Sequence, residues 1–234
     1  MGVSTRWKSH VLPLLIGSLV LLVFIIGVNK TLSDPEAGAP RGEREGIGEL
    51  VATSRACQTF VAQYDGLHRV VVKLDNLGRE NSGPFAFALR TAPDADQNLV
   101  SLTHDASTVG SHAYHTFGFA PISDSAGQHY SFCLEAPKAG LDSAITAIGT
   151  LEDTYPDGQV VFRDMWGARA GVQDLDFSLM YRLSPWKKLA ALGARLAANK
   201  PFLCGRAWFY GFLGIVYLAL LYKLLQSTTL WGQK

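Results

Sequence analysis

The chain of 234 residues has no acidic residue after Asp176, although it contains 20 Asp and Glu. The block 31–183 holds all 20 acids and only 11 Lys and Arg, a net charge of −9. Such a block repels phosphate, which excludes nucleic acid as its partner. The segment 184–234 has seven basic residues and no acid. Its charge suits the anionic headgroups of a lipid bilayer.

Catalytic motifs are also missing. The sequence has no G-x-S-x-G, no H-E-x-x-H, no phosphate-binding loop and no dinucleotide-binding glycine pattern. The nearest approach to a glycosidase pair is Asp174 and Asp176, which alternate with apolar residues and are expected on a solvated strand face. We therefore predict that the protein is not an enzyme and has no catalytic residue and no cofactor.

Few residues have the spacing of metal ligands. His104, His112 and His115 lie within twelve residues, but a spacing of three puts His112 and His115 on opposite faces of a regular strand. We expect no metal there, and calcium bound by the turn 94–96 stays an open alternative. The sequence has three cysteines, of which Cys57 and Cys133 fall in predicted strands and point away from the core. They form either a disulfide or an outward pair of free thiols.

Two long apolar runs stand at the ends of the chain. The run 11–28 is uncharged and follows a short basic head, 1–10. The run 202–225 is uncharged from 207 to 222 and leads into a short tail, 226–234. A bilayer core is crossed by roughly 17–25 apolar residues, so both are predicted transmembrane helices. The first run has no small-residue cleavage site after it and is longer than a usual signal peptide, which favours an uncleaved anchor.

Two further segments join these runs to the middle of the chain. The stretch 29–49 is rich in Gly, Pro and charge and is predicted to be a flexible linker. The stretch 184–200 begins with Ser-Pro and places apolar side chains at helical spacing among Lys and Arg, so it is predicted to be an amphipathic helix in the membrane interface. Its expected membrane contacts are Trp186, Lys187, Lys188 and Arg195.

The block 50–183 reads as soluble β-protein. It contains about nine short alternating segments separated by Gly, Pro, Asp and Asn, which predicts an antiparallel jelly-roll β-sandwich. The corner before one strand is Pro121-Ile-Ser-Asp124-Ser125, where short polar side chains can bond their own turn backbone and Gly127 can take a positive φ. The fold class is therefore mainly β, flanked by two transmembrane helices and a basic interfacial helix.

A succession of short motifs gives this block a resemblance to a known module. The motifs are Gln58-Thr-Phe60, Asp65-Gly-Leu67, Leu77-Gly-Arg79, Phe117-Gly-Phe119-Ala-Pro121 and Asp124-Ser125-Ala-Gly127. Residues 56–183 resemble the jelly-roll module of bacterial envelope proteins, which is often attached to multi-span membrane proteins such as glycosyltransferases. The resemblance implies a carbohydrate-binding-like fold outside the cytoplasm, and it brings no catalytic residues.

Together these features predict a two-pass protein of the bacterial inner membrane with a periplasmic β-domain. We expect a non-enzymatic accessory or scaffolding subunit of a larger membrane complex, with integral membrane subunits and the lipid bilayer as its partners. The alternative is a glycan-binding module in cell-envelope polysaccharide biogenesis. Sugars stack on aromatic rings, so the candidate glycan or partner contacts are Tyr64, Tyr114, Tyr155 and Trp166.

Overall fold

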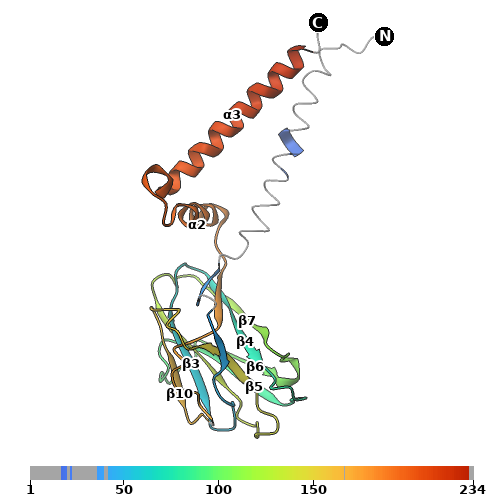
Figure 1. Cartoon of the computed structure of the whole chain (residues 1–234), viewed down its shortest axis with the longest axis vertical. Helices are drawn as coiled ribbons and strands as arrows, with labels where there is room; N and C mark the ends of the chain where they lie inside the picture. The colour runs from blue at the N-terminus through green and yellow to red at the C-terminus, as the bar shows by residue number, and fades with distance from the viewer. Residues whose placement is uncertain (1–16, 20–21, 23–35, 40–41, 166, 232–234) are drawn as a thin grey trace, which may run out of the picture. The chain divides into compact units, whose positions relative to one another are not determined.

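The computed structural model describes residues 17–19, 22, 36–39, 42–165 and 167–231, with side chains except at 36–37 and 224–231. The chain divides into two compact units (Figure 1), and the β-strands all belong to the unit Glu36–Arg182. The predicted head 1–10 and most of the predicted span 11–28 lie outside the described residues. The exceptions, 17–19 and 22, are helical and exposed.

The unit Glu36–Arg182 is mainly β, as predicted, and all nine predicted strands are present. Its described elements are β1 (Glu36–Gly38), β2 (Arg44–Gly46), β3 (Arg55–Val61), β4 (Leu67–Asp75), β5 (Pro84–Arg90), β6 (Val100–Asp105), η1 (Ala106–Thr108), β7 (Ala113–Ile122), β8 (His129–Glu135), β9 (Thr146–Thr150), β10 (Val160–Arg163), β11 (Asp174–Leu175) and β12 (Phe177–Tyr181).

These strands form two sheets. One has the order β1-β12-β4-β9-β11, with β2 added on β9 and β7 added on β4, and the other has the order β10-β3-β8-β5-β6. Every pairing is antiparallel. Most connections carry the chain from one sheet to the other, including β3 to β4, β6 to β7 and β8 to β9. Sequence neighbours therefore often meet across the core.

Aromatic side chains fill the space between the two sheets. The ring of Phe87 stacks on that of Phe117 in the opposite sheet at 4.3 Å, and Phe132 meets Phe177 edge to face at 5.5 Å. All four are at most 1% exposed. Each contributes about 1.5–3 kcal/mol through burial, so this aromatic layer holds the sheets together.

The flexible linker predicted for 29–49 is wrong for its described part, which begins at Glu36. β1 pairs with β12, β2 pairs with β9, and Ile47 is fully buried. The backbone can join a ladder whatever its side chains are, so a composition rich in Gly and charge did not reveal these edge strands. The sandwich begins at Glu36 and not at residue 50.

Cys57 and Cys133 are directly opposite each other on β3 and β8 and form a disulfide, with Cα atoms 4.0 Å apart. They are 2% and 1% exposed although they lie on the face opposite to Phe60 and Phe132. The two cysteine side chains therefore point away from the aromatic core, as predicted, but they are buried and not exposed. Cys204, in the other unit, is free and exposed.

The corner at Ser125 differs in detail from the expectation. Its hydroxyl is fully buried, donates to the carbonyl of Tyr64 at 2.9 Å and accepts the N–H of Leu67 at 3.1 Å. It therefore fastens the connection between β3 and β4 instead of its own turn. Gly127 has the expected positive φ, 74°.

The helical unit contains α2 (Pro185–Ala197), η2 (Phe202–Gly205) and α3 (Ala207–Trp231). Pro185 opens α2, and Ser184 has the extended conformation of a cap but makes no side-chain capping bond. The Tyr210 hydroxyl lies within hydrogen-bonding distance of the carbonyl oxygens of Leu196 (3.0 Å) and Cys204 (2.9 Å), which ties the start of α3 to the end of α2. Among the described residues, no helix combines the length and the apolar character needed to cross a membrane.

Candidate functional site

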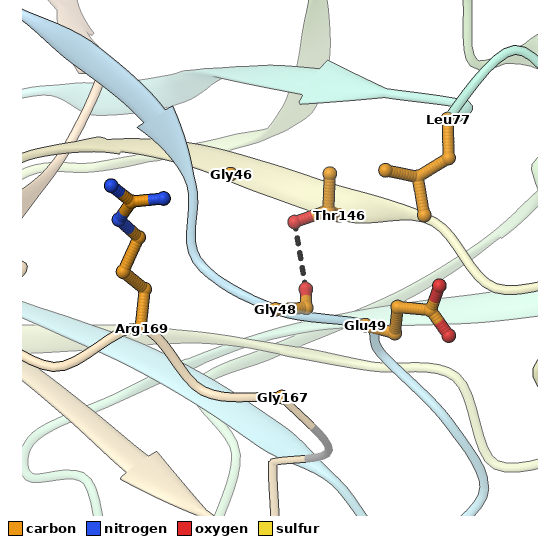
Figure 2. Close-up of a pocket in the computed structure, with 7 residues that line it drawn as sticks. All are labelled: Gly46, Gly48, Glu49, Leu77, Thr146, Gly167 and Arg169. Carbon is orange, nitrogen blue, oxygen red and sulfur yellow. Dashed lines mark hydrogen bonds between the residues drawn. The ribbon is translucent and has the colours of Figure 1, made fainter.

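A shallow pocket of about 390 Å³ opens on the sandwich beside β2 and β9. Figure 2 shows the side chains and glycines that line it. They are Gly46, Gly48, Glu49, Leu77, Thr146, Gly167 and Arg169. Its volume lies in the range of about 300–1,000 Å³ that is usual for small-molecule sites.

Glycine and one hydroxyl group shape the floor of this pocket. Gly48 has φ 118°, a conformation that side chains rarely adopt. A Cβ at Gly46 would touch the Thr146 side chain at 3.5 Å, so a larger residue there would narrow the opening. The Thr146 hydroxyl donates to the Gly48 carbonyl oxygen at 2.7 Å (Figure 2), which fixes the chain that carries Glu49.

The charges of the pocket are paired within the protein. Glu49 accepts from Arg79 at 2.8 Å, and Arg169 forms an ion pair with Glu45. The pocket therefore presents glycine backbone, a hydroxyl and two neutralised charges, with Leu77 as its apolar wall. This set suits a neutral polar ligand better than an ion.

This pocket was not predicted from the sequence, because Gly46, Gly48 and Glu49 lie in the predicted linker. The sequence offers one indication, the apolar Ile47 between two glycines. This pattern is too short to distinguish a strand from a flexible linker. Arg169 and Gly167 come from more than 100 residues further along the chain. The antiparallel pairing of β2 with β9 and the hydrogen bond from the Arg169 N–H to the Ile47 carbonyl, at 3.1 Å, bring these walls near each other.

Three of the four predicted glycan or partner contacts are described, and they do not gather in one groove. Tyr114 is 42% exposed and donates to Asp176 at 3.3 Å, while Tyr64 is half-buried against the Tyr181 ring. Tyr114 pairs with Lys73 near the end of β4, whereas Tyr64 precedes its start, so the two lie at opposite ends of that strand.

The other two predicted contacts are Tyr155, which is buried, and Trp166. Tyr155 is 6% exposed, and its hydroxyl donates to the carbonyl of Val61 at 3.0 Å. Burial raises the pKa of this phenol. Its ring packs edge to face on that of Phe177 at 5.3 Å, which leaves little of the side chain accessible to a ligand. Trp166 lies outside the described residues, and its neighbour Gly167 lines the pocket.

Asp174 and Asp176 are buried, which corrects the expectation of a solvated face. The Asp174 carboxylate accepts from Gln58 Nε2 at 3.1 Å and from the N–H groups of Thr154 and Tyr155, each at 2.9 Å. Burial raises the pKa of Asp174, against the effect of these hydrogen bonds. Leu175 and Phe177 are buried as well, so both faces of this segment are covered and alternation does not predict exposure.

Asp176 has a different set of partners from Asp174. Its carboxylate pairs with Arg44 Nε at 3.0 Å and accepts from Tyr114. The two carboxylates therefore share none of these partners and each closes its own structural contact.

Two of the three candidate histidines are in contact. They are His104 and His115, and not His112 and His115, whose spacing was considered in the sequence. His115 Nε2 on β7 lies 3.0 Å from His104 Nδ1 on β6. Burial lowers the pKa of His115, and the nearby His104 lowers it further. His112 is exposed, with φ 48°, and its Nε2 lies 3.3 Å from Asp75.

No group of three or more His, Cys, Asp or Glu side chains gathers within the described ranges. Asp94 and Asp96, the candidate calcium ligands, are both exposed in their turn.

The predicted interfacial residues lie on α2, whose limits are close to the predicted 184–200. Trp186 is 81% exposed, Lys187 and Arg195 are exposed, and Lys188 is half-buried. Ala191 is buried. A Cβ at Gly193 would lie 3.3 Å from the Ala207 side chain, so small residues let α2 approach the start of α3.

Comparisons with known proteins do not show a family for this chain. No protein-family model and no curated protein matches the chain. Among solved structures, a ruminal GH26 endo-β-1,4-mannanase is similar at 11% identity over 53% of this chain and 22% of its own, with a TM-score of 0.28. A family two carbohydrate esterase from Cellvibrio japonicus is similar at 9% identity over 70% of this chain and 50% of its own, with a TM-score of 0.24. The chain thus spans half or less of either structure, and at these TM-scores neither likeness bears on function.

Proposed function

We propose that the protein is a non-enzymatic, membrane-anchored accessory subunit whose jelly-roll sandwich contacts partners outside the bilayer. The observation that carries the proposal is the apolar surface of α3. Ile215 is 69% exposed, Leu218 57% and Leu220 62%. Exposed apolar surface of this extent is rare on a protein that meets only water, and lipid or partner helices would cover it.

The α2 helix supports the same proposal. Its exposed Trp186 suits the bilayer interface, where an aromatic ring meets both water and hydrocarbon. The net positive charge of 184–234, to which Lys187, Lys188 and Arg195 contribute, favours anionic headgroups. In this arrangement lipid or partner helices cover the apolar side chains of α3, and α2 lies along the bilayer surface.

The proposed location is the bacterial inner membrane, with the sandwich in the periplasm. The disulfide between Cys57 and Cys133 supports an exported domain, because disulfides persist in oxidising compartments and are rare in the cytoplasm. Arg6 and Lys8 in the basic head support a cytoplasmic N-terminus before the first predicted span.

Membrane fractionation and a mild-detergent pull-down test this proposal. We expect the chain to stay in the membrane pellet after alkaline carbonate washing and to be purified with integral membrane subunits at fixed stoichiometry. Leu218→Lys should weaken membrane retention, because a charge near the middle of the apolar run is costly in lipid. Leu141→Lys, at an exposed site on the sandwich, is the matched control and should leave retention unchanged. A chain released by carbonate, or one purified alone, would refute the membrane anchor or the subunit role respectively.

The pocket favours glycan binding as a second candidate function. Its volume, its hydroxyl and its neutralised charges suit a sugar unit. An array of cell-envelope glycans, probed with the full chain in detergent, tests this. Binding should fall with Arg169→Ala and with Glu49→Gln, whereas Tyr114→Phe, outside the pocket, should bind normally. Trp166→Ala tests the predicted aromatic contact whose neighbour Gly167 lines the pocket.

A further inference from the structure

We propose that His104 and His115 form a two-imidazole site for a divalent transition-metal ion, with zinc as the representative, at the edge where β6 and β7 meet. This site is independent of the membrane and glycan roles. It rests on the position of two ring nitrogens that belong to opposite sheets.

The distance between the two nitrogens suits a shared metal ion. His104 Nδ1 and His115 Nε2 are 3.0 Å apart. Zinc binds imidazole nitrogens at about 2.0–2.1 Å in a tetrahedral arrangement, which separates two such nitrogens by about 3.3 Å. A few tenths of an ångström of movement would therefore admit the ion. Neither strand would have to change its pairing.

The orientation of the rings also suits a third atom between them. Their centroids are 4.8 Å apart and their planes are inclined at 78°. If the two nitrogens pointed straight at each other, the ring centroids would be separated by the nitrogen distance plus the radii of both rings. The observed centroid distance is shorter than that sum, so the nitrogens do not point straight at each other. At least one of the facing nitrogens carries a lone pair in the present hydrogen bond. Ion binding needs only that the shared proton move to the other nitrogen of its own ring, with no net loss of protons.

The surroundings leave the remaining coordination positions to water. The rings pack against Phe85 and Phe117, and both imidazoles are half-buried, so one side of the pair is accessible. The neighbouring candidate ligands are engaged elsewhere. Asp105 accepts from the Ser107 N–H, and His112 is held at Asp75. The site would thus have two protein ligands and an open side, whereas structural zinc sites are closed by four protein ligands.

A metal at this point would join the two sheets. β6 is the edge of the sheet β10-β3-β8-β5-β6, and β7 is added at the edge of the other sheet. The connection between them is short, running through η1. An ion bound to both histidines would hold the edges together and would stabilise the folded sandwich by binding only the native state.

Metal-dependent thermal unfolding of the full chain in mild detergent, without a histidine tag, tests the proposal. Zinc chloride at about 100 times its dissociation constant should raise Tm by about 5–10 °C, and magnesium chloride should have no effect. His104→Phe and His115→Phe keep a ring beside Phe85 and should each abolish the zinc shift. His112→Ala, which removes a nearby exposed histidine, should retain it.

X-ray absorption of the zinc-loaded wild type provides a second readout that does not depend on any variant. Two imidazole nitrogens at about 2.0–2.1 Å, with oxygen in the other positions, are expected. The absence of a zinc shift in the wild type would overturn the proposal. A shift that survives in His104→Phe, or a spectrum without two imidazoles, would also overturn it and assign the binding to other histidines.

Discussion

Asp174 offers the sharpest test of how the sandwich is held together. Its side chain is fully buried and accepts three N–H donors, from Gln58 Nε2 and from the backbone of Thr154 and Tyr155. Asp174→Ala would leave all three donors without this acceptor. Each buried, unpaired polar group costs about 1–3 kcal/mol, so we expect a loss of about 3–5 kcal/mol in the free energy of unfolding. Domains are stable by only about 5–15 kcal/mol, so this is a large part of the total.

Asp174→Asn separates the hydrogen bonds from the charge. The amide oxygen can still accept from Thr154 and Tyr155, but the amide nitrogen then faces Gln58 Nε2, which is also a donor. Gln58 cannot simply turn over, because its Oε1 accepts from the N–H of Leu175 at 2.8 Å. One hydrogen bond is lost, and a cost of about 1–2 kcal/mol is expected at acidic pH.

The pH dependence of this difference has a definite sign. Burial raises the folded-state pKa of Asp174 above its ordinary value of 3.8. The contribution of Asp174 to stability is therefore complete below pH 3.8 and declines as the pH rises through the raised pKa. The advantage of the wild type over Asp174→Asn should narrow over that rise.

Urea unfolding of the full chain in mild detergent measures these effects, with the near-ultraviolet circular dichroism of the sandwich as the signal. The disulfide should be kept intact throughout. An Asp174→Ala variant within about 0.5 kcal/mol of the wild type would refute the reasoning that this carboxylate satisfies buried donors. An Asn variant whose disadvantage grows with pH would refute the sign.

Two further predictions concern the frame of the sandwich. Replacing Cys57 and Cys133 together by Ser should lower the free energy of unfolding by about 2–4 kcal/mol, because the bridge closes a loop of 76 residues, and urea unfolding with Cys204→Ser as the control checks this. An equal loss in the control would contradict it. Gly66→Ala should lower Tm far more than Gly78→Ala, because both have positive φ, 74° and 70°, but only at Gly66 would a Cβ meet backbone, 2.5 Å from the carbonyl oxygen of Arg182. Equal Tm values for the two variants would show that this close approach is unimportant.

The sequence predicted the strands of the sandwich well, because their signals are local. Alternation of apolar and polar side chains, as in Phe85, Phe87 and Leu89, marks a strand that buries one face. The helix α2 was equally accessible, since Pro185 and the spacing of its leucines mark its start and its faces. The short strands β1 and β2 escaped prediction, because edge pairing depends on backbone partners far away in the sequence.

The candidate site was much less predictable than the fold. The pocket combines glycines near residue 46 with Arg169, and no local pattern links them. Exposure was also misjudged, since Tyr155 and Asp174 are types of residue that are usually near the surface but are buried here with their hydrogen bonds satisfied.

By itself, the sequence determined that the middle of this chain is an antiparallel β-domain with apolar helical segments beside it, because periodicity and charge are properties of neighbouring residues. Only the tertiary structure decided that Cys57 meets Cys133, that Ser125 anchors Leu67, and that His104 faces His115. These contacts join residues on different strands, and their geometry depends on strand register and on which sheet each strand enters. The physical reason is that a strand's side chains alternate locally, whereas its partners are chosen by the packing of the whole sandwich.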